Sequence, residues 1–353
     1  MTKIWQKPIH SFKEVDRAGQ CYVYKRSSKK EIEDALTVIN NWREAHGLPL
    51  QRFRSILYRY SIKVQNSPRP LIAHRIKRIV SIKRKLELND HMRLSQMQDI
   101  GGCRVVLKDV YKVMELLQEF KNSRIKHVAL PIKDYINHPK ETGYRAIHLI
   151  YKYKSNENND YDDLRIEIQI RTQLQHIWAT AVETVDNLTK NALKSNIGPQ
   201  EWKRFFVLMS SVIAKEEGTP LVPNTPEKEN DLLKELVSLS QKLKVEKTLE
   251  AFTYVLTETS HKDLKNATYF LIELDRNRKS ITITGFIKAD LRYATKKYME
   301  RENVLKAKGN EVVLVSVDKQ KDLKKAYPNY YADTKEFLNI LRRALKNAEK
   351  IEK

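Results

Sequence analysis

The side chains best suited to chemistry in this chain lie in one run, RIEIQIR, at residues 165–171. Isoleucine occupies every second position, so the isoleucines would share one face of a strand and the polar side chains the other. The polar face would carry Arg165, Glu167, Gln169 and Arg171. A carboxylate flanked by guanidinium groups suits a site where a metal ion and phosphates meet. The alternative is that Glu167 only forms an ion pair with one of these arginines.

A second carboxylate, Asp99, stands just before a predicted strand and next to Gly101 and Gly102. Glycine lets the backbone approach a ligand closely, and a carboxylate at a strand end is a common ligand of Mg²⁺, which prefers oxygen donors. The alternative is an aspartate that caps a turn. Together with Glu167, Asp99 predicts a phosphoryl-transfer site, in which positioning and charge neutralisation supply most of the catalysis.

Arginine and lysine side chains would have to hold the phosphates, because the sequence contains neither G-x-x-x-x-G-K-[ST] nor G-x-G-x-x-G. Arg75 and Lys77 lie in residues 71–88, where apolar side chains repeat at helical spacing, and we predict a basic helix there. Arginine can also stack on a purine. Taken singly, each residue is equally well explained as part of a solvated basic face.

A lysine-containing loop, residues 133–143, leads into a predicted strand that starts at Tyr144. Strand alternation would place Tyr144 and His148 on the same face. An exposed aromatic ring beside a basic loop is suited to stacking on a nucleobase. The alternative is a tyrosine that packs on the rim of the sheet.

A sheet has to position these residues, and strand-like segments alternate with helical ones in the first 217 residues. The predicted strands are 103–107, about 124–130, 146–153 and 164–171. The predicted helices are 31–46, about 51–66, 71–88, 109–121, 172–191 and 199–216. Such alternation is typical of an α+β fold with a mixed β-sheet flanked by helices.

A segment with three prolines, residues 218–230, predicts a linker between domains 1–217 and 231–353. We expect the second domain to be a small α+β unit. Its predicted helices are about 232–259, 288–307 and 333–348, and its predicted strands are 267–274, 279–287 and 311–317.

The charge of this 353-residue chain is strongly positive, with a net charge of +22. Such a protein is attracted to polyanions such as nucleic acid, although a lysine-rich surface without a partner is the simpler alternative. The two cysteines exclude a disulfide framework and a zinc site built from cysteine. The sequence has no apolar leader and no apolar run near the ~18 residues that span a bilayer. We therefore expect a cytoplasmic protein without a membrane partner.

Four of these segments together resemble the synthetase domain of the RelA/SpoT family, the alarmone pyrophosphokinases. They are RIKRIVSIKRKL, QDIGGCRVVL, KDYINHPKETGYRAIHLIY and RIEIQIRTQLQHIWA, in matching order and spacing across about residues 70–190. The resemblance implies a nucleotidyltransferase-like sheet flanked by helices. It also implies ATP as donor, Mg²⁺ as cofactor, and transfer of the β,γ-pyrophosphate to a ribose 3′-hydroxyl.

The resemblance further implies a role for each matched residue. Asp99 and Glu167 would hold Mg²⁺, and one of them would help to activate the acceptor hydroxyl. The residues implied for ATP binding are Arg75, Lys77, Arg104 and Arg171. Tyr144 would stack on the acceptor base, and the implied acceptor-binding residues are Lys133, Tyr144, Arg145, His148, Gln169 and His176.

The C-terminal part resembles CapRel-type proteins, which are fused toxin–antitoxins of the toxic small alarmone synthetases. The matching segment is AYPNYYADTKEFL, with Tyr327 and Tyr330 in a Tyr-x-x-Tyr arrangement. The resemblance implies a pseudo-zinc-finger domain that folds back on the active site, with these tyrosines inhibiting it, until a phage capsid protein or another phage protein binds. Beyond residue 220 the chain has no cysteine and a single histidine, His261, so a zinc finger cannot form there. The alternative is that both tyrosines fill the core of the second domain.

Three functions remain open from the sequence. The first is a toxin that pyrophosphorylates the 3′ CCA end of tRNA, which the +22 charge favours. The second is an alarmone synthetase that uses GDP or GTP as acceptor with the same catalytic residues. The third is a catalytically inactive RNA-binding or sensor protein, against which the carboxylates and Tyr144 argue. An upstream hydrolase domain is not expected, because the N-terminal segment lacks a His-Asp pair.

Overall fold

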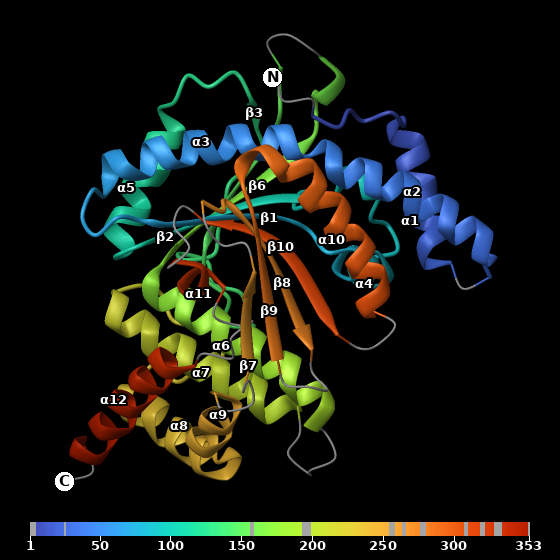
Figure 1. Ribbon diagram of the computed structural model, residues 1–353. Coiled ribbons are helices and arrows are strands. Elements are labelled where there is room, and N and C mark those ends of the chain that lie inside the picture. Colours follow the sequence, from blue (N-terminus) through green and yellow to red (C-terminus); the bar gives the residue numbers. More distant parts are fainter. Residues whose placement is uncertain are drawn as a thin grey trace.

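A mixed β-sheet runs through this computed structural model, which describes residues 5–24, 26–155, 159–192, 199–253, 258–262, 266–275, 280–306, 310–317, 322–327 and 334–351. The sheet has ten strands in the order β3-β5-β6-β2-β1-β10-β8-β9-β7, with β4 paired to β5 (Figure 1). The strands of the first half are β1 Leu71–Ile76, β2 Gly101–Leu107, β3 Val128–Ala129, β4 Lys133–Asp134, β5 Ile147–Lys152 and β6 Arg165–Thr172. Those of the second half are β7 Glu258–Lys262, β8 Tyr269–Asp275, β9 Ser280–Phe286 and β10 Glu311–Val317. The predicted mixed sheet flanked by helices is confirmed.

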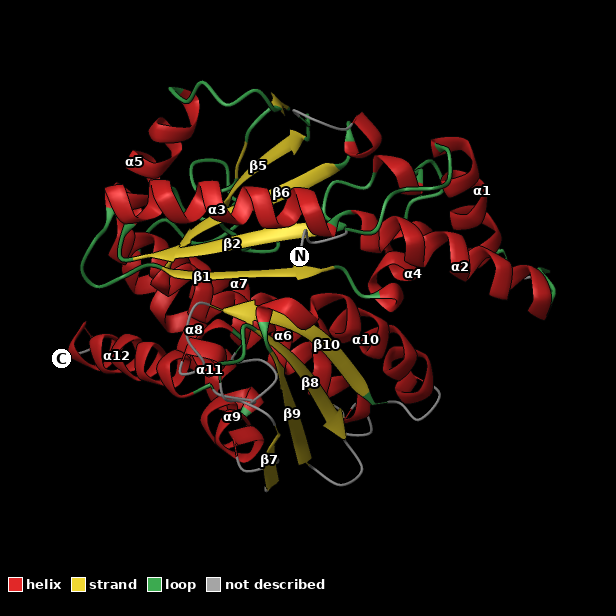
Figure 2. Ribbon diagram, turned by 45° about the horizontal axis from the view of Figure 1, so that its top comes forward, coloured by secondary structure: helices red, strands yellow, loops and turns green. Residues whose placement is uncertain are grey.

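Helices cover both faces of this sheet (Figure 2). The helices of the first half are α1 Phe12–Val23, α2 Lys29–Ala45, α3 Gly47–Val64, α4 Ile79–Glu87, α5 Val110–Lys121, α6 Gln173–Ala192 and α7 Pro199–Glu217. Those of the second half are α8 Glu229–Leu243, α9 Val245–Thr253, α10 Leu291–Lys306, α11 Leu323–Ala326 and α12 Lys335–Ile351. Within the described residues, none of the helices combines the length and the apolar character that crossing a bilayer requires.

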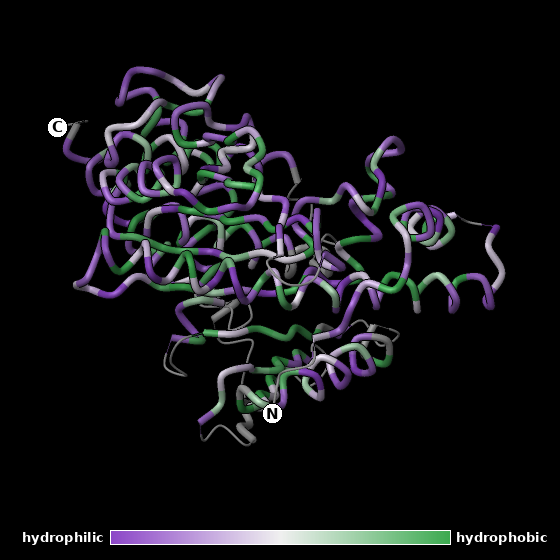
Figure 3. The backbone as a smooth tube through the Cα atoms, turned by 90° about the horizontal axis from the view of Figure 1, so that it is seen from above, coloured by the Kyte–Doolittle hydropathy of each residue, from purple (hydrophilic) through white to green (hydrophobic). Residues whose placement is uncertain are grey.

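The main core lies between helix α3 and the strands below it. Ile166, Ile168 and Ile170 are fully buried there, in one cluster with Leu57 of α3 and Leu116 of α5. Hydrophobic stretches run through the interior of the chain trace, while many outer turns are hydrophilic (Figure 3). Burial of the isoleucines leaves the alternate side chains of β6 on the opposite face of the sheet, as their spacing predicts.

The C-terminal part joins the same sheet through strand β10. It pairs antiparallel with β1, where Val315 lies opposite Arg75. Helices α8, α9 and α12 pack instead against α6 and α7, in a second cluster that includes Phe205 and Phe337. The division into domains 1–217 and 231–353, with a linker between them, stays a prediction.

The predicted helix at 71–88 is wrong in its first third. Residues 71–76 form strand β1, which lies between β2 and β10, and only Ile79–Glu87 form helix α4. The apolar side chains of a strand and of the following helix together imitated one helical stripe. Hydrogen bonding to a strand on each side outweighed local periodicity, since strand formation depends mainly on such tertiary context.

Other boundaries also differ from expectation. Helix α1 was not predicted, although Ser11 and Glu14 form a capping box at its start. Helix α3 begins at residue 47 rather than about 51, and the strand expected at 124–130 is only Val128–Ala129. The helix expected at 232–259 is broken at Lys244, whose φ of 48° is left-handed, and residues 258–259 belong to β7.

Gly101 and Gly102 should respond differently to substitution. A Cβ on Gly101 would lie 2.6 Å from Cδ1 of Ile166, whereas a Cβ on Gly102 would meet nothing within 4 Å. We expect Gly101→Ala to destabilise the protein by about 1–3 kcal/mol through overpacking. Gly102→Ala, the matched control, should leave thermal unfolding nearly unchanged. Equal unfolding temperatures for the two variants would contradict the packing of β2 against β6.

Candidate active site

The strand register builds one row of functional side chains across the sheet. Gly102 of β2 lies opposite Glu167 of β6 on one side and Arg75 of β1 on the other. Arg104 lies opposite Gln169 in the next row. Because the space above Gly102 is open, a ligand can lie on the backbone between Glu167 and Arg75. Of the predicted glycine pair, Gly102 offers this space, whereas Gly101 is packed against Ile166.

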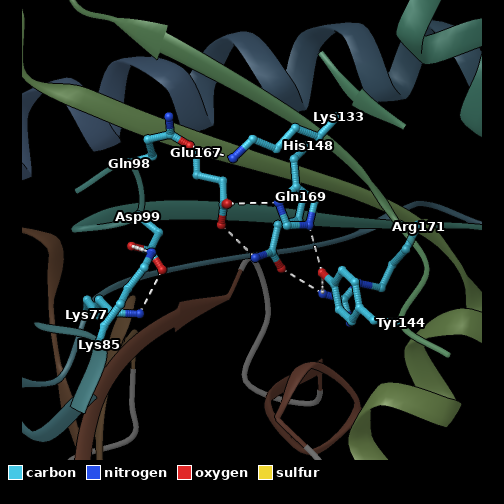
Figure 4. A network of polar contacts seen from close by, with 10 residues as sticks. All are labelled: Lys77, Lys85, Gln98, Asp99, Lys133, Tyr144, His148, Glu167, Gln169 and Arg171. Carbon is cyan, nitrogen blue, oxygen red and sulfur yellow. Dashed lines mark hydrogen bonds and ion pairs between the residues drawn. The ribbon is translucent and has the colours of Figure 1, made fainter. Parts of the chain in front are cut away.

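Asp99 lies at the edge of this row and is held by two lysines (Figure 4). Lys77 Nζ is 2.7 Å from Oδ2 of Asp99, and Lys85 Nζ is 2.9 Å from Oδ1. Burial raises the pKa of Asp99, but the charges and hydrogen bonds of Lys77 and Lys85 outweigh it and lower the pKa to about 2. The carboxylate is therefore ionised at neutral pH. Lys85 was not singled out from the sequence, where a run of basic residues surrounds it.

Glu167 receives two hydrogen-bond relays that both start at Arg171 (Figure 4). In one, Arg171 Nη2 donates to Gln169 Oε1 at 2.6 Å, and Gln169 Nε2 donates to Glu167 Oε2 at 2.7 Å. In the other, Arg171 Nη2 lies 3.4 Å from the Tyr144 hydroxyl, which lies 2.8 Å from His148 Nε2. His148 Nδ1 is 2.9 Å from Glu167 Oε1. A proton on His148 Nδ1 lets the imidazole donate to Glu167 Oε1 in this relay.

The two relays decide the charge of Glu167. Burial raises its pKa and the nearby charge of Asp99 raises it further, but hydrogen bonds from His148 and Gln169 outweigh both, so the pKa of Glu167 is lowered. The two carboxylates are thus close enough to repel each other while both stay ionised. Such a pair attracts a divalent cation.

Tyr144 and the loop before it form the other end of the site. Arg171 Cζ lies 5.8 Å from the centre of the Tyr144 ring, and Lys140 Nζ lies 5.7 Å from it. Lys133 Nζ donates to Gln98 Oε1 at 2.8 Å, and Gln98 directly precedes Asp99 in the chain. Gln98 was not named among the site residues. Its position directly before the candidate metal ligand Asp99 is the feature of the sequence that could have indicated it.

Arg145 is not brought to this site. Its guanidinium is buried and donates to Ser210, Thr219 and the carbonyl oxygens of Ile136 and Pro220. These bonds fasten the start of β5 to the segment after α7. Burial lowers the pKa of Arg145 to about 10, and the side chain is occupied by structural contacts.

Arg104 and His176 contact the C-terminal part. Arg104 Nη2 donates to the carbonyl oxygen of Ala326, and its guanidinium lies 5.4 Å from the ring centre of Tyr327. His176 Nε2 lies 3.0 Å from the carbonyl oxygen of Lys325. Burial and the charges of Arg104 and Arg171 lower the pKa of His176 well below its usual value, so Nε2–H of a neutral imidazole donates this bond.

Tyr327 is buried at the contact between α11 and β1. Its hydroxyl donates to the carbonyl oxygen of His74 at 3.2 Å, and its ring joins a cluster with Ala73 and Phe270. Tyr327 therefore both fills a core, as the alternative interpretation had it, and stacks under Arg104. Tyr330 lies outside the described residues.

A cavity of about 880 Å³ lies elsewhere, between α10 and the junction of α2 and α3. Its lining includes Arg75, but it includes neither Asp99 nor Glu167. The cavity therefore adjoins the polar row at Arg75, while the two carboxylates of the row lie outside its lining.

Known proteins share the part of the chain that builds the polar row. Residues 74–186 match the family region described as a region found in RelA/SpoT proteins. The chain contains a RelA/SpoT synthetase domain. Its enzyme class is therefore that of the RelA/SpoT pyrophosphokinases, and the resemblance stated from the sequence motifs is confirmed at this level.

Two relatives from Bacillus subtilis (strain 168) overlap this domain. GTP pyrophosphokinase YwaC is 29% identical over 168 residues, which are 43% of this chain and 78% of the relative. GTP pyrophosphokinase YjbM is 28% identical over 134 residues, which are 36% of this chain and 62% of the relative. Among solved structures, the small alarmone synthetase 1 of Bacillus subtilis bound to its product pppGpp is 22% identical, with a TM-score of 0.42, over 53% of this chain and 93% of that chain.

The carboxylates of the RelA/SpoT domain fit a magnesium ion. Asp99 and Glu167 offer ionised oxygen donors close to each other, and Mg²⁺ is usually held by one or two carboxylates together with substrate phosphates and water. In the part of the chain that the structure describes, no group of three or more His, Cys, Asp or Glu side chains could hold a metal. The remaining ligands would therefore come from phosphate and water.

The ion pairs of Asp99 predict a pH dependence of stability. The pKa of Asp99 falls from 3.8 to about 2 on folding, so its stabilising effect is complete above about pH 4 and is lost as the pH falls toward 2. This difference corresponds to about 2 kcal/mol. We expect Asp99→Asn to flatten the decline of the free energy of unfolding between pH 4 and pH 2.5, measured by urea titration. Lys85→Met should give an intermediate slope, and equal slopes in all three proteins would refute the ion pairs.

Proposed function

We propose that this chain is an ATP-dependent pyrophosphokinase that modifies the 3′-hydroxyl of the tRNA CCA end and thereby blocks translation. We propose also that its C-terminal part restrains the activity until a phage protein binds. The observation that carries the proposal is the polar row itself: two ionised carboxylates lie among arginines and lysines on one face of the sheet, next to the open space above Gly102.

The chemistry follows from the charges of this row. The acceptor oxygen would bond the β-phosphorus of ATP, the bond from that phosphorus to the α-phosphate oxygen would break, and AMP would leave. Glu167, ionised and supported by His148 and Gln169, would receive the hydroxyl proton. Arg75, Lys77, Arg104 and Arg171 would bind the phosphates. A magnesium ion held by Asp99 and Glu167 would supply charge neutralisation on the phosphate oxygens.

The net charge of +22 supports tRNA as acceptor. A tRNA stem is a polyanion, so binding would release counterions and weaken steeply with salt. Tyr144, which has Arg171 and Lys140 near its ring, would stack on the terminal base. Lys133 and His148 would border the same pocket.

A guanine nucleotide is the second candidate acceptor. The support for it is that two relatives of the domain are named GTP pyrophosphokinases. GDP or GTP would use the same carboxylates and the same tyrosine, and would need no basic surface outside the pocket. The two candidates therefore differ in what they require of the rest of the molecule.

Restraint by the C-terminal part rests on three contacts. The carbonyl oxygens of Ala326 and Lys325 engage Arg104 and His176, and the Tyr327 ring lies under Arg104. A guanidinium bound in this way is not free to hold a phosphate. The phage trigger, a capsid protein or another phage protein, is supported by the resemblance of the Tyr-x-x-Tyr segment, and Tyr330 would act with Tyr327.

The acceptor can be identified by label transfer from γ-³²P-ATP with the full-length protein. We expect label on tRNA, with tRNA binding that weakens between 50 and 200 mM salt by about 10³-fold or more if several phosphates are contacted. Label on GDP or GTP alone would make the chain an alarmone synthetase.

Asp99→Asn and Glu167→Gln should each reduce transfer by at least about 10³-fold, as loss of a central electrostatic contact does. Transfer that survives both substitutions would refute the assigned site.

The restraint can be tested at Tyr327. We expect Tyr327→Ala to raise label transfer, because the ring no longer lies under Arg104. Tyr327→Phe keeps the ring and removes the hydroxyl that bonds His74, so it should stay close to wild type. Tyr327 belongs to an apolar cluster, so its truncation also costs about 3 kcal/mol of stability. Val313→Ala, in the same cluster, controls for that loss. Equal activation by Val313→Ala would show that loosened packing, and not release of Arg104, raises the activity.

A further inference from the structure

A buried ion pair joins helix α10 of the C-terminal part to helix α2 of the first half. Arg43 Nη2 donates to Glu302 Oε2 at 2.8 Å, and the two side chains are 1% and 6% exposed. The same nitrogen lies 3.0 Å from the Tyr298 hydroxyl, which donates to Glu302 Oε1 at 3.1 Å. Burying two charges is costly and contributes little net stability on its own. Net stability therefore does not explain why the pair is buried, and the other hydrogen bonds of Arg43 and Glu302 suggest a different role.

Both partners of this pair also bind the backbone that leads into α4. Glu302 Oε1 accepts a hydrogen bond from the backbone N–H of Ile79 at 2.8 Å. Ile79 is the first residue of α4, and Arg78 before it makes no side-chain capping hydrogen bond. A carboxylate at this position satisfies one of the free N–H groups of the helix start and stabilises its dipole. Helix α4 is thus capped by a residue that lies 223 positions away in the sequence.

Arg43 binds the backbone of Lys77, which lies two positions before Ile79. Its Nε donates to the carbonyl oxygen of Lys77 at 3.0 Å. The N–H of Lys77 donates in turn to the carbonyl oxygen of Ile100 at 2.8 Å, next to Asp99. The backbone of Lys77 is therefore fixed on both sides, and its ammonium group reaches Asp99 at 2.7 Å. Lys85, the other cation on Asp99, lies on the helix that Glu302 caps.

We propose that Arg43 and Glu302 are positioning residues, through which helix α10 holds the segment carrying Lys77 and Lys85 in the geometry that binds the phosphates of ATP. The C-terminal part then has two effects on the synthetase domain. On one face of β1 its residues 325–327 contact Arg104 and His176, and on the other face α10 completes the phosphate-binding segment. The assignment of ATP as the ligand rests on the proposed function, whereas the positioning of Lys77 does not.

The test compares variants of the full-length protein in two measurements, hydrogen exchange of peptides covering residues 77–87 and calorimetric titration with ATP and Mg²⁺. Glu302→Gln keeps the shape and removes the charge. We expect faster exchange at the start of α4 and about tenfold weaker ATP binding, the typical effect of losing one charge-assisted hydrogen bond. Glu273→Gln breaks an ion pair of α10 that does not touch α4, to Arg301 at 2.5 Å. This control should change neither measurement.

A second variant covers the case in which Glu302→Gln does not fold because Arg43 is left without its partner. This triple variant replaces all three polar groups by apolar ones, as Arg43→Met, Tyr298→Phe and Glu302→Met. Such a replacement is often tolerated, but it removes the bonds to Lys77 and Ile79. Val313→Ala lowers stability without touching these bonds and shows what destabilisation alone does.

Each outcome decides between the claims. A folded variant that lacks both bonds, with exchange and ATP affinity as in wild type, overturns the positioning role. Weaker ATP binding in Val313→Ala to the same extent also overturns it, because general destabilisation would then suffice. Wild-type protein that binds no ATP refutes the proposed donor, and the exchange at residues 79–82 then decides the positioning by itself.

Discussion

The register of strands β1, β2 and β6 is the constraint on which the rest of the structure depends. It places Arg75, Gly102 and Glu167 in one row, and a slip by a single residue would turn Glu167 into the core. What prevents the slip is apolar burial on the other face, where Ile166 and Ile168 are fully enclosed under α3. The hydrophobic effect thus fixes the position of the charges, although it contributes nothing to their chemistry.

Strand β1 also carries the connection between the synthetase domain and the C-terminal part. It pairs with β2 on one edge and with β10 on the other. Residues 325–327 lie against one face of the sheet, at Arg104 and His176, and α10 reaches the segment after β1 through Glu302. A change in the C-terminal part therefore acts on the same strand from two sides. In this arrangement, the proposed restraint and the proposed positioning both involve contacts around one strand.

The local elements were largely predictable, because apolar spacing identified most helices and strands and the polar face of β6 in particular. The errors have physical causes. Residues 71–76 adopt a strand because partners lie on both sides, which periodicity cannot reveal. The left-handed Lys244 interrupts an otherwise continuous apolar stripe. Within the site, Asp99, Glu167, Gln169, Arg171, Tyr144 and His148 were anticipated and do lie together, whereas Arg145 is taken up by contacts to Ser210, Thr219 and Pro220.

The sequence by itself determined which chemistry the chain can support: two carboxylates, several cations suited to phosphate and a tyrosine suited to stacking, at spacings that place them at strand ends and on one strand face. The tertiary structure decided which cations serve which carboxylate, and that Lys85 joins Lys77 on Asp99. It alone revealed Glu302 at the start of α4. The physical reason is that side-chain identity and alternation are local, whereas hydrogen bonds between distant segments exist only once the sheet has brought those segments together.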